Sequence, residues 1–79
     1  MTPKQREIAR LVSLGYNGTE IAKQLGLTKR AVHARLSRAY VLTGARSQAA
    51  LVGWSVAHGV VTVEELREAY AGGARGQVG

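Results

Sequence analysis

The sequence predicts an all-α fold, and three observations support this. Three times a residue that can cap a helix is followed, three positions later, by Glu or Gln: Thr2 with Gln5, Asn17 with Glu20, and Thr62 with Glu65. This spacing is the capping box that begins many helices. Glycines follow the apolar patterns of the expected helices at positions where helices commonly stop. No segment alternates apolar and polar residues as a half-buried strand does.

The first two helices follow from these signals. Pro3 suits the first position of a helix that ends near residue 14, before Gly15, and Ile8, Leu11 and Val12 form its apolar stripe. The second helix begins after Asn17 and lasts about two turns before Gly26. Its inner face is predicted to consist of three residues: Ile21, Ala22 and Leu25.

Three further helices complete the predicted fold. Thr28 caps a helix over 29–42 that Gly44 ends, and Ser47 caps a fourth that runs to about His58. The shared apolar face of the third helix holds Val32, Leu36, Ala39 and Tyr40. We therefore expect one domain over residues 1–61, a short amphipathic helix over 62–71 and a disordered, glycine-rich tail over 72–79.

Composition excludes several classes of protein. The 79 residues carry a formal net charge of +6 and contain neither Cys nor Asp, so a disulfide framework and a thiolate nucleophile are excluded. The longest apolar run, 49–57, is too short to span a membrane, and no signal peptide is evident. No pair of carboxylates or nucleophile–His pair can be assembled, so we expect no enzyme, no metal and no cofactor. The expected location is the cytoplasm, in association with the nucleoid.

Charge is concentrated in the first part of the chain. Nine of the 11 Lys and Arg residues lie within 1–46, and no acidic residue occurs between Glu20 and Glu64. Such a one-sided field raises the local concentration of polyanions. A solvated basic face that serves only solubility is the alternative, but mixed charges would serve solubility equally well.

Residues 21–32 have the pattern of a helix-turn-helix. Two helices joined by a short turn cross closely, which requires a small residue such as Ala22. The turn requires a residue that tolerates a left-handed conformation, such as Gly26. Leu27 would fill the space below the turn, and a basic helix follows Thr28. Many helical hairpins use a similar Ala and Gly pair, so the outer face of the next helix decides the interpretation.

Over residues 2–61 the sequence resembles the LuxR/GerE-type helix-turn-helix domain. The matching runs are Thr2 to Glu7, Glu20 to Thr28, Ala31 to Arg38, Gly44 to Ser55, and His58 to Val60. The resemblance implies a four-helix domain whose third helix reads the major groove of DNA and whose fourth commonly supplies a dimer contact. The helix over 62–71 is then a short fifth helix added to that domain. Because Met1 lies two residues before the first helix, we expect a stand-alone domain without a sensor.

The chain departs from the family pattern in two places. Arg35 stands where the family has a recognition-helix His. Val41, Leu42 and Thr43 stand where Arg-Lys-Leu is usual, which places Thr43 at an apolar core position and Leu42 at a solvated one. We therefore expect Leu42 to dock on the C-terminal helix.

The outer face of the third helix carries the expected DNA contacts. Its residues are small, polar or basic, as insertion into the major groove requires. Base contacts are predicted for His33, Ala34, Ser37 and Arg38. Phosphate contacts are predicted for Lys23, Thr28, Lys29, Arg30, Arg35 and Arg46. An ordinary solvated helix face is the alternative for both sets. His58 is interpreted as a helix C-cap.

The fourth helix has two apolar faces, of which only one can pack on the core. The inner face is predicted to hold Ala50, Leu51, Trp54 and Ala57. The second face holds Ala49, Val52, Gly53 and Val56, which we expect to form a homodimer interface. Alternatively, the chain covers that face with its own Val60, Val63, Leu66 and Tyr70.

Together these features predict a protein that binds double-stranded DNA sequence-specifically, as a transcriptional regulator. One alternative is a phage-type architectural or recombination accessory protein. Another is a small module that binds RNA polymerase or a sigma factor, for which the acidic residues Glu64, Glu65 and Glu68 would be suited.

Overall fold

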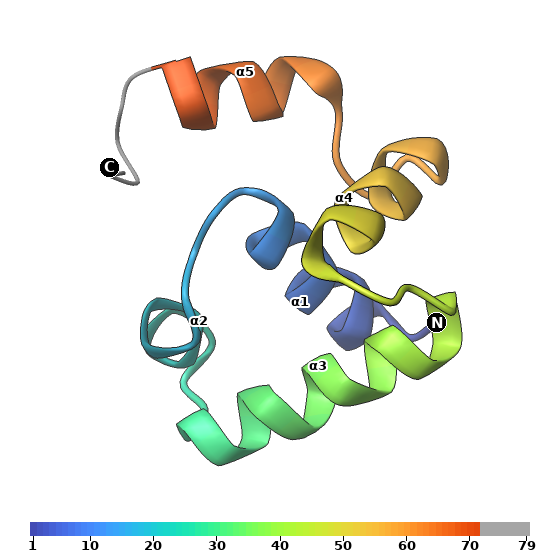
Figure 1. The fold of residues 1–79 in the computed structure, drawn as a ribbon. Coiled ribbons are helices and arrows are strands. Elements are labelled where there is room, and N and C mark those ends of the chain that lie inside the picture. The colour runs from blue at the N-terminus through green and yellow to red at the C-terminus, as the bar shows by residue number, and fades with distance from the viewer. Residues whose placement is uncertain (72–79) are drawn as a thin grey trace.

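The computed structural model describes residues 1–71, and this part of the chain is all-helical, as predicted. Figure 1 shows α1 at the centre, α3 along the lower edge and α5 at the top. The five helices are α1 (Pro3–Ser13), α2 (Gly18–Leu25), α3 (Lys29–Thr43), α4 (Gln48–Ala57) and α5 (Val63–Ala71). The prediction of a disordered tail over 72–79 lies outside the described residues. None of the described helices is long and apolar enough to cross a bilayer.

The capping residues predicted from the sequence are found at the ends of the helices. All three predicted capping boxes are present, with both hydrogen bonds of each box between 2.8 and 3.2 Å. Thr28 and Ser47 cap α3 and α4 through their hydroxyl oxygens. His58 is the C-cap of α4, and its ring stacks on Trp54 at a centroid distance of 4.0 Å. Each N-cap contributes about 1 kcal/mol, so the start of each helix is well determined.

The core surrounds α1. This helix packs against both α3 and α4, while α2 packs mainly against α3. Its buried side chains are joined in one cluster by residues from every other helix except α5 and by Val60. The cluster consists of Ile8, Ala9, Leu11, Val12, Ile21, Ala22, Val32, Leu51 and Val60. A core this small leaves α3 with one buried face and one face free.

Thr43 is accommodated at its half-buried position by hydrogen bonds. Its hydroxyl donates to the carbonyl oxygen of Ala39 at 2.9 Å. The hydroxyl oxygen of Thr43 also accepts the backbone N–H of Ala45 at 3.2 Å. Because its polar atom is satisfied within the last turn of α3 and the loop that follows, Thr43 does not disturb the packing at the end of α3.

The inner face of α4 differs from the prediction. Leu51 is fully buried, as expected, but Ala50 and Ala57 are exposed and Ser55 is fully buried in their place. The buried stripe is centred between Leu51 and Ser55, and a residue such as Ala50 lies about 120° away around the helix. The prediction placed only apolar residues on the inner face and therefore overlooked Ser55, which lies in the buried stripe beside Leu51.

Replacement of Ser55 by alanine is expected to stabilise the protein. The Ser55 hydroxyl is buried and has no hydrogen-bond partner among the described residues. Removal of a buried, unsatisfied hydroxyl at nearly constant volume relieves its desolvation cost. We expect Ser55→Ala to raise the free energy of unfolding by about 1 kcal/mol in urea denaturation. A matched control is Ser13→Ala, because the Ser13 hydroxyl donates to Ala9 at 2.7 Å, and its loss should not stabilise. Equal effects of the two substitutions would contradict this explanation.

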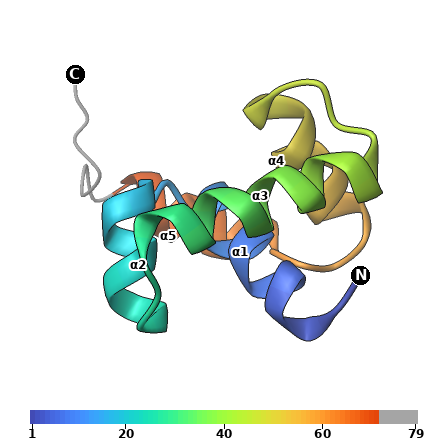
Figure 2. The same cartoon turned by 90° about the horizontal axis from the view of Figure 1, so that it is seen from below.

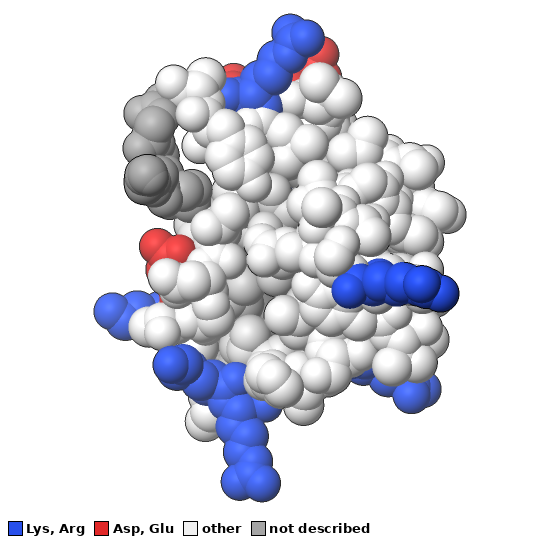
Figure 3. Space-filling view, in the orientation of Figure 1, with Lys and Arg blue, Asp and Glu red and all other residues white. Residues whose placement is uncertain are grey.

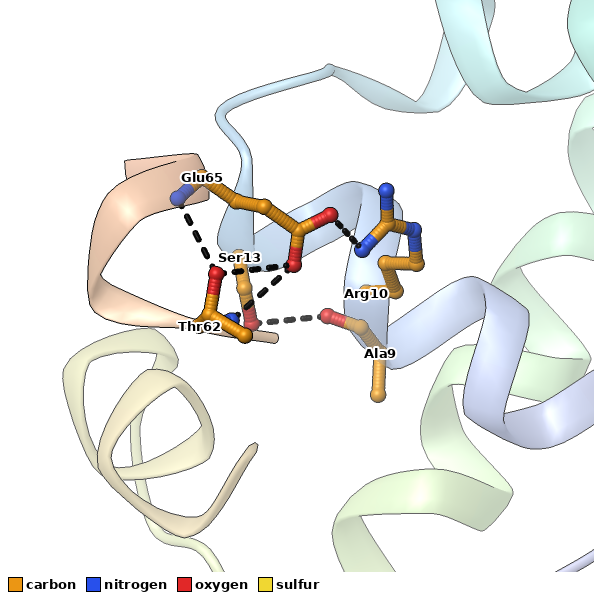
Figure 4. A network of polar contacts seen from close by, with 5 residues as sticks. All are labelled: Ala9, Arg10, Ser13, Thr62 and Glu65. Carbon is orange, nitrogen blue, oxygen red and sulfur yellow. Dashed lines mark hydrogen bonds and ion pairs between the residues drawn. The ribbon is translucent and has the colours of Figure 1, made fainter. Parts of the chain in front are cut away.

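α5 is anchored to α1 by two polar contacts, of which Figure 4 shows the one between Glu65 and Arg10. Glu65 forms an ion pair with Arg10, and its carboxylate also accepts the backbone N–H of Thr62. At the other end of the helix, the Tyr70 hydroxyl donates to the carbonyl oxygen of Ser13 at 2.7 Å. Both contacts join α5 to the second half of α1.

This position corrects two expectations. Leu42 is 46% exposed on α3, and α3 and α5 lie on opposite sides of the molecule, so the expected docking of Leu42 on the C-terminal helix is wrong (Figure 2). α5 also docks on α1 rather than over the second face of α4, so the alternative that the chain covers this face itself is wrong as well. Val60 is in the core, while Val63 and Tyr70 are about half exposed. The apolar periodicity of α5 did not specify its partner.

The attachment of α5 is expected to weaken at acidic pH. The backbone hydrogen bond from Thr62 and the bond from Arg10 lower the pKa of Glu65 below its usual value of 4.5. A lowered pKa in the folded state contributes stability above pH 4.5 that is lost as the pH falls through the folded-state pKa. We expect the protection of the α5 backbone amides against hydrogen exchange, measured relative to their intrinsic exchange rates, to decrease as the pH falls through the folded-state pKa of Glu65. Glu65→Gln should remove this pH dependence, whereas Glu64→Gln, one residue away, should preserve it. Protection factors of the α5 amides that do not change with pH would refute the role of Glu65.

Candidate nucleic-acid interface

α2 and α3 are joined by a turn whose geometry is that of a helix-turn-helix. Gly26 ends α2 in the left-handed region at φ 66° and ψ 35°, and its backbone N–H donates to the carbonyl oxygen of Ala22. A Cβ at Gly26 would meet no atom within 4 Å, so conformation rather than space favours glycine here. Ala22 is buried where the helices approach, and Leu27 packs against the core below the turn. These three roles were predicted from the sequence, and they are confirmed.

α3 lies on the outside of the molecule. Figure 2 shows it crossing in front of α1, with α5 behind. Its buried residues, Val32 and Ala39, lie on one side, where half-buried Leu36 and Tyr40 also pack against the core. The opposite side is therefore free along the length of the helix.

The four predicted base-contacting residues lie together on this free side. His33, Ala34, Ser37 and Arg38 are all exposed. The helical period of 3.6 residues places Ala34, Ser37 and Arg38 in successive turns of one face, with His33 at its edge. The structure thus brings these side chains to one surface and leaves that surface uncovered by the described residues.

Five of the six predicted phosphate-contacting residues are exposed as well. Thr28, Lys29 and Arg30 surround the start of α3, Lys23 projects from α2, and Arg46 lies in the loop before α4. The Thr28 hydroxyl oxygen accepts the backbone N–H of Ala31 at 3.1 Å, which leaves its own hydrogen available for donation.

Arg35 is placed differently from the other five. It is half-buried and lines a hollow of about 330 Å³ with residues of the first turns of α1 and of the α2–α3 turn. Lys4 and Glu7, one basic and one acidic residue, line the same hollow. The position of Arg35 at the edge of the α3 face explains this partial burial.

Basic side chains dominate the side of the molecule that carries α3. In Figure 3 most Lys and Arg side chains project from the lower half, over α2 and α3. The exposed acidic residues Glu64 and Glu68 belong to α5, on the opposite side. No carboxylate occurs in α3 itself. The free face of α3 therefore adds no negative charge of its own to the surface that meets an approaching polyanion.

One exposed residue of α3 was not recognised from the sequence. Val41 is 71% exposed, more than any other large apolar residue in the described part of the chain. It lies seven residues after Ala34 and three after Arg38, on the same face. Continuation of the i, i+3, i+4, i+7 pattern beyond Arg38 would have included it.

The second face of α4 is accessible in the described structure. Ala49 and Gly53 are exposed, and Val52 and Val56 are half-buried. These are the four residues of the predicted dimer interface. They form a surface of small side chains that could approach another helix closely.

Comparison with known proteins connects this arrangement to regulators. The chain is 37% identical over 59 residues to the response regulator Rre1 of Synechocystis sp.. The matched stretch covers 75% of this chain and 26% of that protein. The chain is also 38% identical over 52 residues to the putative HTH-type transcriptional regulator MT0914 of Mycobacterium tuberculosis, and this stretch covers 66% of the chain and 6% of that protein. A putative HTH-type regulator of Mycobacterium bovis, Mb0914c, is similar to the same extent.

The chain thus spans about a quarter of the response regulator and a small part of the mycobacterial regulators. No family model and no solved structure matches it. The similarities nevertheless agree with the geometry of the α2–α3 turn. Residues 18–43 of this chain form a helix-turn-helix within an all-helical unit related in sequence to transcriptional regulators.

Proposed function

We propose that the chain is a DNA-binding regulator of the LuxR/GerE helix-turn-helix type that inserts α3 into the major groove. The observation that carries this proposal is the free face of α3, which is exposed along the helix and holds no carboxylate. The acidic helix α5 lies on the opposite side of the molecule. An α-helix with short side chains near its centre and hydrogen-bond donors at its edges fits the groove, about 12 Å wide.

The roles of individual side chains follow from this orientation. His33, Ala34, Ser37 and Arg38 contact base edges, with Arg38 bidentate to a guanine and Ala34 against a thymine methyl group. The exposed basic residues around the start of α3 and Arg46 contact phosphates and position the helix without reading sequence. Arg35 joins them from the flank of α3.

The proposed regulator acts as a homodimer paired through α4. Two observations support the pairing: the small and apolar side chains of Ala49, Val52, Gly53 and Val56 are accessible, and α5 docks elsewhere. Twofold pairing presents two copies of α3 to two half-sites. Analytical ultracentrifugation at micromolar concentration should show a dimer that Val52→Arg dissociates, because the substitution places like charges across the twofold axis. A strict monomer, free and on DNA, would eliminate the pairing.

Selection of bound duplexes from a random DNA library tests the proposed function. Enrichment of an inverted repeat is the expected result. Binding without enrichment would favour an architectural or recombination accessory protein. An absence of binding would contradict the proposal and favour a module that binds RNA polymerase or a sigma factor.

A further inference from the structure

We infer that Val41 is an additional specificity-determining residue, which recognises the 5-methyl group of a thymine next to the bases read by Ala34, Ser37 and Arg38. This inference rests on the proposed function, because it assumes that the free face of α3 lies in the major groove. It extends the contact surface of α3 by one helical turn towards Thr43.

The position of Val41 on α3 is the first argument. Residues at i, i+3, i+4 and i+7 share a face of an α-helix, and Ala34, Ser37, Arg38 and Val41 have this spacing. A surface that contacts a duplex through the first three therefore presents Val41 to the same groove. Leu42, the next residue, is turned by about 100° towards the flank of the helix.

The exposure of Val41 is the second argument. Its side chain is 71% exposed and is absent from the apolar cluster around α1, so the fold gains little from it. A β-branched residue is also less favourable in an exposed helix than Ala, Lys or Arg. The apolar surface that the fold leaves free is suited to the thymine methyl group, which is the apolar feature of the major groove.

The spacing of the two apolar residues predicts a feature of the DNA site. Seven residues separate Ala34 from Val41, which corresponds to about 10 Å along the helix axis. With about 3.4 Å between base pairs, this distance matches about three base-pair steps. The bound sequence should thus contain two thymines at that separation, with the guanine read by Arg38 between them or on the opposite strand.

The test replaces each thymine of the selected duplex by uracil, one at a time, which removes only the methyl group. Duplex affinity is measured by fluorescence anisotropy for the unmodified chain, Val41→Ala and Leu42→Ala. For the unmodified chain, uracil in place of the thymine read by Val41 is expected to weaken binding about threefold to fourfold, the effect of one buried methyl group. Val41→Ala should bind that uracil duplex and the parent duplex equally well.

Leu42→Ala is the matched control, because it shortens a neighbouring, 46% exposed apolar side chain on the flank of α3. It should retain the full preference for thymine. Thermal denaturation of both variants establishes that they fold. The inference is overturned if Val41→Ala retains the unmodified chain's preference at every thymine, if Val41→Ala loses affinity equally on all duplexes, or if the selected site lacks the second thymine. If the unmodified chain binds no duplex, the proposed function fails first, and the role of Val41 fails with it.

Discussion

Affinity for a duplex with a single half-site, which one copy of α3 contacts, is expected to fall about 500-fold when the salt concentration rises from 50 to 200 mM, for about five phosphates neutralised. Each neutralised phosphate releases condensed counterions, and the logarithm of the binding constant should fall against that of the salt concentration with a slope near −4.5. The structure offers six candidates for these contacts, of which five are exposed and Arg35 is half-buried. The slope is measured by titrating one duplex at several salt concentrations.

Two arginine variants give this measurement a control. Arg30 is exposed at the start of α3, and Arg67 is exposed on α5, on the far side of the molecule. Arg30→Ala should reduce the slope by about 0.9, the contribution of one phosphate. Arg67→Ala removes the same charge and should leave the slope unchanged. Equal reductions would mean that net charge, rather than the surface around α3, determines binding, and a flat salt response would refute the proposed function.

Arg38→Ala is expected to weaken binding to the selected site by about 1–3 kcal/mol, which is about 5- to 150-fold. The exposed guanidinium of Arg38 lies on the free face of α3, where it can donate two hydrogen bonds to one guanine. Its loss should also relax the preference at that base pair, so that duplexes substituted there bind as well as the parent. Competition between the parent duplex and its three single-base variants measures both effects.

Arg67→Ala is again the control for the loss of charge, because Arg67 is distant from α3. It should leave the base preference intact. A uniform loss of affinity on all duplexes would show that Arg38 contacts a phosphate. The other base contacts would then have to account for the specificity.

Most of the fold could be predicted because its determinants are local. Thr2, Asn17 and Thr62 begin helices through hydrogen bonds to residues three positions away, and such bonds can be read directly from the sequence. The turn at Gly26 follows from the conformational freedom of one residue. The free face of α3 was also predictable, because apolar periodicity identifies the buried side and so the exposed one.

The features that were not predicted depend on contacts between distant parts of the chain. The position of α5 rests on Tyr70 and Ser13, which are 57 residues apart, and on the ion pair of Arg10 with Glu65. No periodicity within 62–71 specifies these partners. Ser55 was missed for a different reason: hydropathy places serine outside, whereas the orientation of α4 against α1 buries it.

Within the candidate site, the sequence predicted the composition of the surface better than its limits. Arg35 was grouped with the exposed basic residues, but its angular position turns it towards α1, where it is half-buried. Val41 was compared with a basic residue of the related domains and was not considered as part of the contact surface. Its place on the free face follows from the helical spacing, which was not continued beyond Arg38, and the structure shows that it is exposed.

Replacement of single guanines by 7-deazaguanine in the selected duplex tests the orientation of α3 most directly. This base lacks only the N7 acceptor, which lies in the major groove. At one guanine, the substitution should weaken binding by the unmodified chain and have no further effect on Arg38→Ala. No sensitivity in either protein would contradict the insertion of α3 into the major groove, and equal sensitivity of the two proteins at every guanine would contradict the guanine contact of Arg38.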